Sequence, residues 1–181
     1  MKTYVALFAG MMLAGFLVGC SQQTEAPTAE GQSNSESAAS VDGSAFLLDA
    51  EPEGAGDVIA VREQAGDGDE IVIVGRIGGS ANPWIDGRAA FSIVDGSLKA
   101  CSDIEGDNCP KPWDYCCETS RLPDATALVK VVDDNGELVE ADAKELLNVK
   151  ELSTVVVQGK AQRDEAGNLT VLASGVFVKQ K

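Results

Sequence analysis

The chain contains no histidine, few aromatic residues and far fewer basic than acidic residues. Only two Trp, two Tyr and five Phe occur in its 181 residues, and 14 Lys and Arg stand against 29 Asp and Glu. Without histidine, imidazole metal ligands and histidine-based general bases or nucleophile dyads are excluded. The low basic content argues against nucleic-acid binding, because affinity for phosphate backbones comes mostly from Lys and Arg displacing counterions.

The chain also lacks an apolar run long enough to cross a bilayer. The run at residues 4–18 is about 15 residues long, short of the roughly 20 that a spanning helix needs. It follows Lys2 and closes on Leu17-Val18-Gly19-Cys20, a pattern that resembles the signal of bacterial lipoproteins. An ordinary secretory signal with an incidental Cys20, or a transmembrane anchor, remains as an alternative.

The lipoprotein resemblance implies that residues 1–19 are a cleaved signal peptide and that Cys20 is the lipidated mature N-terminus. Ser, and not Asp, follows Cys20, which implies an anchor in the cell envelope, at the periplasmic face of the outer membrane. Cleavage would remove one Lys and no acid, leaving 13 basic and 29 acidic residues and a net charge near −16. Attachment to the membrane then depends on the acyl chains, because a chain this acidic offers no polybasic patch for anionic lipids.

The composition divides the remaining chain into a tether and one domain. Residues 21–44 are rich in Ser, Ala, Gln and Glu and nearly free of large apolar side chains. Such a segment cannot bury enough surface to offset the entropy of ordering, so residues 20–44 are expected to form a lipidated Cys and a disordered linker. Residues 45–181 have the length of a single domain.

Within this domain the apolar pattern is mostly that of strands. Five β-branched runs bounded by turn residues are expected to be strands, at 70–77, 88–94, 126–132, 153–161 and 168–179. Residues 163–167 are expected to form the turn of a hairpin between the last two strands. Helical spacing predicts a helix at 57–64, before the first strand, and another at 141–149, with Asp142 able to cap it.

Five strands with a helix between the third and the fourth is the order of an OB-fold, a small Greek-key barrel. The domain is therefore expected to be all-β, an OB-fold-like five-stranded barrel with one or two short helices. Gly75, Gly78 and Gly79 fit a strongly bent first strand, as a small barrel requires. A small β-sandwich, which also builds from short strands, is the alternative.

Three segments of the domain resemble a group of secreted or lipid-anchored bacterial proteins of planctomycete type. They are 75–79 (GRIGG), 86–95 (DGRAAF with IVD) and 109–117 (CPKPWDYCC). The resemblance covers roughly residues 66–178 and implies a compartment and a fold, but no activity that can be transferred to particular residues.

The connection at 96–125 carries the residues with the most distinctive chemistry. It is unusually long for a compact domain, and Cys101, Cys109, Cys116 and Cys117 fall within it. An even set of cysteines in an exported protein predicts disulfides. A bridge between the vicinal pair would be strained, so each member is expected to pair with Cys101 or Cys109, in either arrangement. A thiolate metal site or a redox-active pair is the alternative.

Five further residues are candidates for ligand contact: Trp84, Trp113, Tyr115, Arg76 and Arg88. Loops at that end of an OB barrel often border the ligand, and aromatic side chains can stack on it. The alternatives are that the aromatic residues pack the long connection onto the barrel and that the two arginines form ordinary surface ion pairs.

The sequence favours a non-catalytic binding or adaptor module of the cell envelope, with a protein, peptide or glycan partner and no cofactor. No nucleophile elbow or histidine is present to support a hydrolase. A metal-binding or thiol-redox protein that uses the Cys-rich connection is the second hypothesis. An OB-type nucleic-acid binder is the third, and the acidic charge disfavours it.

Overall fold

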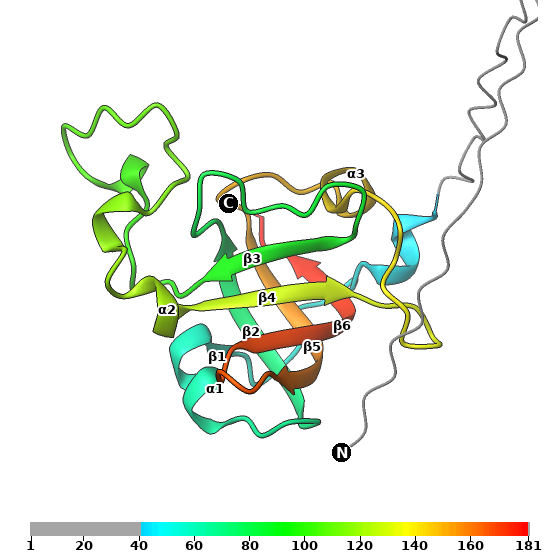
Figure 1. Ribbon diagram of the computed structural model, residues 1–181. Coiled ribbons are helices and arrows are strands. Elements are labelled where there is room, and N and C mark those ends of the chain that lie inside the picture. The colour runs from blue at the N-terminus through cyan, green and yellow to red at the C-terminus, as the bar shows by residue number, and fades with distance from the viewer. Residues whose placement is uncertain (1–40, 181) are drawn as a thin grey trace, which may run out of the picture. The chain divides into compact units, whose positions relative to one another are not determined.

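The computed structural model describes residues 41–180 of the protein (Figure 1). The predicted signal peptide at 1–19, the predicted lipidation site Cys20 and the predicted linker as far as residue 40 lie outside the described residues. Within the described part, no helix has the length and apolarity needed to span a membrane.

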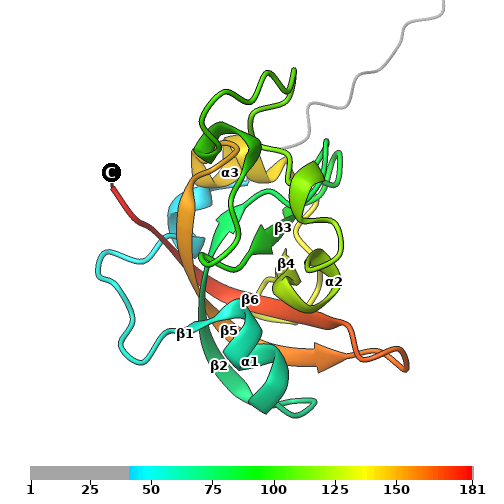
Figure 2. The same cartoon turned by 90° about the vertical axis from the view of Figure 1, so that its left-hand side faces the viewer.

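Five strands form a closed barrel (Figures 1 and 2). They are β2 (Glu70–Ile77), β3 (Ala90–Val94), β4 (Thr126–Val131), β5 (Thr154–Arg163) and β6 (Leu169–Val178). Neighbours follow the order β2-β3-β4-β6-β5, and β5 returns to β2. The β4–β6 pair is parallel, and the other four pairs are antiparallel. This is the all-β, OB-fold-like barrel predicted from the sequence, and the sandwich alternative is not adopted.

The barrel core is filled by alternate residues of each strand. In β4, Ala127, Val129 and Val131 are buried while the residues between them are partly exposed. The same alternation in the other strands gives one continuous apolar cluster, with Phe91 as its largest fully buried barrel residue. Closure leaves no long open edge among these Val-rich strands, which removes the risk that they pair with another chain.

Two short helices pack against this core from opposite ends of the barrel (Figure 2). The helix α1 (Val58–Gln64) precedes β2 and buries Val58, as predicted. The helix α3 (Ala143–Leu147) lies between β4 and β5 and is shorter than the predicted 141–149, because Asn148 adopts a left-handed conformation that ends it. Asp142 occupies the N-cap position, but its carboxylate accepts a hydrogen bond from the Gly87 N–H at 3.0 Å instead of capping the helix.

The first element of the described residues begins at Gly43, just before the predicted domain boundary at residue 45. A short 3₁₀ turn, η1 (Gly43–Phe46), packs beside α3. A Cβ atom at Gly43 would overlap the Leu146 carbonyl, so only glycine allows this approach. A two-residue strand, β1 (Gly56–Asp57), then pairs in parallel with β2.

Two strands depart from regular pairing: β5 has a register shift, and β2 changes its partner strand. The β5–β6 register shifts between Gln158 and Gly159, where a Cβ would overlap the Leu172 carbonyl. The strand β2 instead changes partner along its length, pairing with β5 up to Arg76 and with β3 at Arg76 and Ile77. Gly75 is needed there for space, because its added Cβ would lie 3.0 Å from the Ile93 Cβ.

The long β3–β4 connection is folded into three helical turns. These are η2 (Cys101–Asp103), η3 (Cys116–Glu118) and α2 (Leu122–Ala125). A second, small apolar cluster holds the connection against the barrel, with Tyr115 fully buried at its centre beside Val94 and Leu98. The connection projects from one side of the barrel in Figure 1.

Candidate functional site

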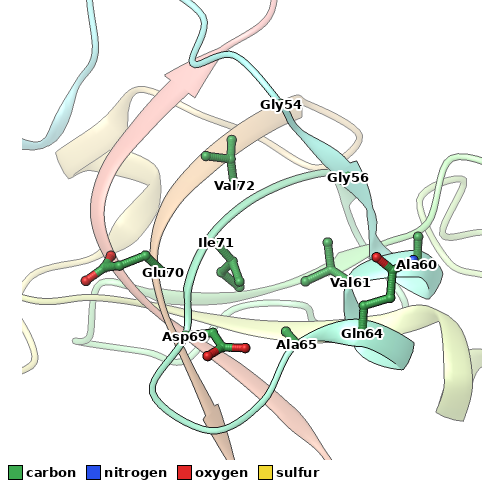
Figure 3. Close-up of a pocket in the computed structure, with 10 residues that line it drawn as sticks. All are labelled: Gly54, Gly56, Ala60, Val61, Gln64, Ala65, Asp69, Glu70, Ile71 and Val72. Atoms are coloured by element: carbon green, nitrogen blue, oxygen red, sulfur yellow. The ribbon is translucent and has the colours of Figure 1, made fainter.

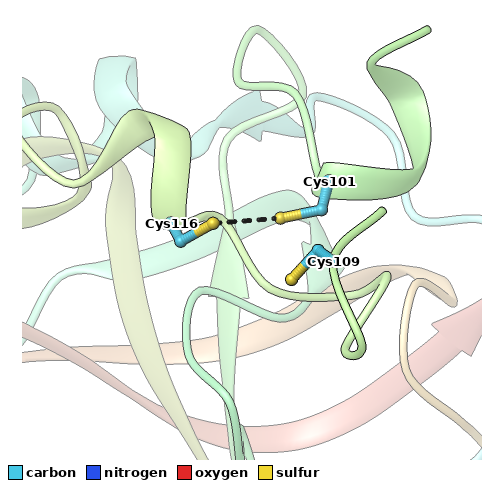
Figure 4. A group of neighbouring side chains, drawn as sticks. All are labelled: Cys101, Cys109 and Cys116. Atoms are coloured by element: carbon cyan, nitrogen blue, oxygen red, sulfur yellow. Dashed lines mark hydrogen bonds between the residues drawn. The ribbon is translucent and has the colours of Figure 1, made fainter. Parts of the chain in front are cut away.

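Three of the four predicted cysteines meet in the connection. The Sγ atoms of Cys101, Cys109 and Cys116 all lie within 4.8 Å of one another. Cys101 and Cys116 face each other with 3.4 Å between their sulfurs, and Cys109 lies beside them (Figure 4). Cys101 is buried, Cys109 is half-buried and Cys116 is exposed, so the cluster has an inner wall and an open side.

Main-chain hydrogen bonds hold the segments that carry these thiols. Cys101 donates its N–H to the Asp114 carbonyl at 2.8 Å, and Ser102 donates to the Pro112 carbonyl at 2.9 Å. These two bonds tie η2 to the segment just before η3, and buried Tyr115 fixes that segment on the barrel. The three sulfurs are therefore brought together by the fold of the connection, from positions far apart in its sequence.

Cys117 lies outside the three-thiol cluster. It follows Cys116 in η3, and successive side chains of a 3₁₀ turn point about 120° apart. Cys117 is exposed, and its thiol interacts with that of Cys116 without joining the group of three mutually close sulfurs.

The four cysteines of the described chain carry free thiols, so the two predicted bridges are not formed in this structure. Of the expected pairs, Cys101 and Cys116 are neighbours, but the 3.4 Å between their Sγ atoms is a hydrogen-bond distance. Cys109 is also close to them, whereas Cys117 interacts with Cys116 without joining the group of three mutually close sulfurs. The pairing of each vicinal cysteine with Cys101 or Cys109 stays a prediction.

Burial controls the protonation of the innermost thiol. It raises the pKa of Cys101 to about 12, and the hydrogen bond with Cys116 acts in the same direction. With an ordinary thiol pKa near 8.5, this thiol stays protonated at neutral pH unless a cation takes the place of its proton.

Arg76 of β2 and Tyr115 of the connection make their contacts within the protein. The Arg76 guanidinium forms an ion pair with Asp103 of η2. The Tyr115 ring packs on Gly78, where an added Cβ would come within 2.7 Å of the ring. Burial raises the pKa of Tyr115, and its hydroxyl is buried without a hydrogen-bond partner among the described residues.

The two tryptophans and Arg88 are also engaged in internal contacts. Trp84 packs on Phe91, with ring centroids 5.8 Å apart, and its Nε1 donates to Glu151 at 2.8 Å. Trp113 donates its Nε1–H to the Ala81 carbonyl at 3.2 Å. Arg88 pairs with Glu140 at the surface. The five predicted ligand-contact residues thus do not line one common pocket.

A groove that the sequence did not reveal crosses the outer face of the barrel. Its floor is a row of register partners on three adjacent strands, Ser92 of β3, Leu128 of β4 and Thr170 of β6. One wall comes from Thr119, Leu122 and Pro123 of the connection, and the other from the β5–β6 turn with Asp164 and Asn168.

This groove has a volume of about 560 Å³ and mixes hydroxyl and amide groups with apolar side chains. Arg62 of α1 lines one end, where its guanidinium donates to the Thr126 carbonyl at 2.8 Å. The small side chains of Ser92 and Thr170 leave the floor low. The alternation along each strand indicates which side chains face outward. Their alignment across three strands depends on strand register, which cannot be read from the sequence.

A second hollow, of about 390 Å³, lies between α1 and the start of β2 (Figure 3). Val61, Ala65 and Ile71 line it, with the carboxylates of Asp69 and Glu70 nearby. The Asp69 carboxylate already accepts the Gly66 N–H at 2.7 Å. The hollow therefore offers apolar side chains and acids, and no basic side chain lines it.

No family model matches the chain, and no curated protein matches it.

Proposed function

We propose that the protein is a lipid-anchored protein of the cell envelope whose barrel acts as a non-catalytic binding module. The groove over β3, β4 and β6 is its ligand site, and a glycan is the class of ligand that fits its chemistry. Its place in the barrel carries the proposal, because the outer face of the second and third strands is where OB-folds take oligonucleotides and oligosaccharides. In this chain those strands are β3 and β4.

The lining favours a glycan over an oligonucleotide. Ser92, Thr119, Thr170 and Asn168 offer hydroxyl and amide groups that match the hydroxyls of a sugar. A phosphate backbone would need a basic track. Among the described residues that line the groove, Arg62 is the single basic side chain, and the charge of the acid Asp164 in the same lining acts on it.

Filling the groove tests its role. Thr170→Trp places a large ring on the floor, and it should weaken glycan binding roughly tenfold or more, a loss of at least about 1.4 kcal/mol. A glycan array incubated with the mature chain would identify the ligand, and isothermal titration would then compare variants. Gln158→Trp on β5, outside the groove, is the matched control and should bind as the wild type does.

The outcome that contradicts this site is a Thr170→Trp variant that stays folded and binds as tightly as the wild type. Absence of any array ligand for the wild type would contradict the glycan class.

The anchor is tested separately. Replacing Cys20 with Ala should release the protein from membranes into the soluble fraction, whereas the wild type should fractionate with the outer membrane. A wild-type chain that never fractionates with membranes would refute the lipid anchor but would not bear on ligand binding in the groove.

A further inference from the structure

We propose that Cys101, Cys109 and Cys116 form a binding site for one monovalent copper ion, held by three thiolates. The site is independent of the proposed glycan groove. It uses side chains that take no part in the barrel core and that lie together in the connection (Figure 4).

The spacing of the sulfurs fits a thiolate-bound metal ion. With metal–sulfur bonds of about 2.3 Å, trigonal or tetrahedral coordination separates the sulfurs by roughly 3.8–4.0 Å. The three Sγ atoms lie within 4.8 Å of one another, and those of Cys101 and Cys116 are 3.4 Å apart. Shifts of under about 1 Å would seat the ion, and rotation of the exposed Cys116 and half-buried Cys109 can supply them.

The donor set selects the ion. Soft thiolates suit Cu(I), whereas structural Zn²⁺ takes four protein ligands. Within the described residues the cluster holds three thiols and neither a carboxylate nor a fourth thiol. Cys117 neighbours Cys116 but lies outside the group of mutually close sulfurs, so the cluster itself offers three ligands.

The fold prepares the site before the ion arrives. Hydrogen bonds from Cys101 and Ser102 hold η2 against the segment before η3, so little ordering is needed on binding. The exposed side at Cys116 gives the ion an entry path, and buried Cys101 closes the other side. Binding breaks three S–H bonds, forms three Cu–S bonds and releases three protons to solvent, with no change in the oxidation state of copper.

The test is an anaerobic titration of the reduced, full mature chain with Cu(I) in competition with a chromophoric Cu(I) chelator. We expect one Cu(I) per chain, and X-ray absorption should report three sulfur neighbours. Cys109→Ser should weaken binding roughly 10–100-fold or more. Cys109 is only half-buried, so this variant should fold; circular dichroism of the barrel would verify that.

Cys117→Ser is the matched control, because it removes a neighbouring thiol outside the cluster. It should retain the wild-type affinity and stoichiometry, and Cys101→Ser and Cys116→Ser should both lose binding. The proposal is overturned if Cys117→Ser weakens binding as much as Cys109→Ser, or if the reduced chain binds Zn²⁺ stoichiometrically and Cu(I) not at all. It is also overturned if chain isolated from the envelope carries a Cys101–Cys116 disulfide and, once reduced, takes up no copper.

The groove offers a check on independence. Thr170→Trp should leave Cu(I) affinity unchanged, since Thr170 lies on β6 and outside the cysteine cluster. Failure of glycan binding would therefore not contradict the copper site, and failure of copper binding would not contradict the groove as a ligand site.

Discussion

The barrel and the Cys-rich connection are built in opposite ways. Each barrel strand pairs on both sides, and the strands share a large apolar core. The connection has no strand and is held by a few loop hydrogen bonds and a small cluster around Tyr115. The stability of the protein is therefore concentrated in the barrel, and its thiol chemistry in the connection. Variants that unfold one region and spare the other would measure how separate the two are.

The largest effect is expected from the barrel core. Phe91 is fully buried and packs on Trp84. Phe91→Ala removes most of a ring from a closed core and should lower the free energy of unfolding by about 3–5 kcal/mol. Urea denaturation followed by circular dichroism would measure the loss.

Ile85→Ala is the control for Phe91→Ala. Ile85 is 42% exposed in the loop before β3, so its truncation should change stability by less than about 0.5 kcal/mol. Equal losses in the two variants would show that the apolar core does not dominate the stability of the barrel.

The strands were predictable because their residues carry the signal locally. The β-branched runs at 70–77 and 126–132 match the observed strands to within a residue, and the left-handed Asn148 accounts for the short α3. The connection was not predictable, because its turns contain no periodic pattern. That Cys109 joins Cys101 and Cys116 follows from η2, η3 and the bonds between them. The groove was not predictable either, because the alignment of Ser92, Leu128 and Thr170 depends on the register of three strands, which is set by long-range pairing.

The stability of the junction between the barrel and the connection should depend on pH. Asp95, at the end of β3, is 3% exposed. Its carboxylate accepts the Ile59 N–H at 2.8 Å and the Ser97 N–H at 2.9 Å, which links α1 to the start of the connection. Burial opposes ionisation, but these donors and the charge of Arg121 outweigh it and lower the pKa of Asp95.

Asp95→Asn should cost about 1–3 kcal/mol at neutral pH, because an amide leaves one of the two buried N–H donors without an acceptor. A lowered folded-state pKa means that the carboxylate stabilises the fold fully above the unfolded value of about 3.9, and that this stabilisation is lost as the pH falls through the folded pKa.

The stability gap between wild type and Asp95→Asn should therefore be constant near neutral pH and shrink below about pH 4. Urea titrations at several pH values would measure it. Asp134→Asn, in the exposed turn after β4, is the control and should cost less than about 0.5 kcal/mol. A gap that widens in acid would contradict the assigned role of the Asp95 charge.

The smallest effect is expected at the centre of the connection. The Tyr115 ring is fully buried, and its hydroxyl has no hydrogen-bond partner among the described residues. A buried hydroxyl without a partner contributes nothing favourable to set against its desolvation. Tyr115→Phe keeps the ring on Gly78 and should leave stability within about 0.5 kcal/mol of the wild type, or raise it slightly.

Thermal denaturation and Cu(I) titration together would test Tyr115→Phe. Both should be nearly unchanged, because the ring, and not the hydroxyl, fixes the segment that carries Cys116. Tyr115→Ala is the contrasting variant: it empties the small cluster, should loosen the connection while the barrel stays folded, and should weaken copper binding. If Tyr115→Phe costs more than about 1 kcal/mol, the hydroxyl has a bonded partner such as an ordered water. The connection would then be held by a polar contact as well as by its apolar cluster.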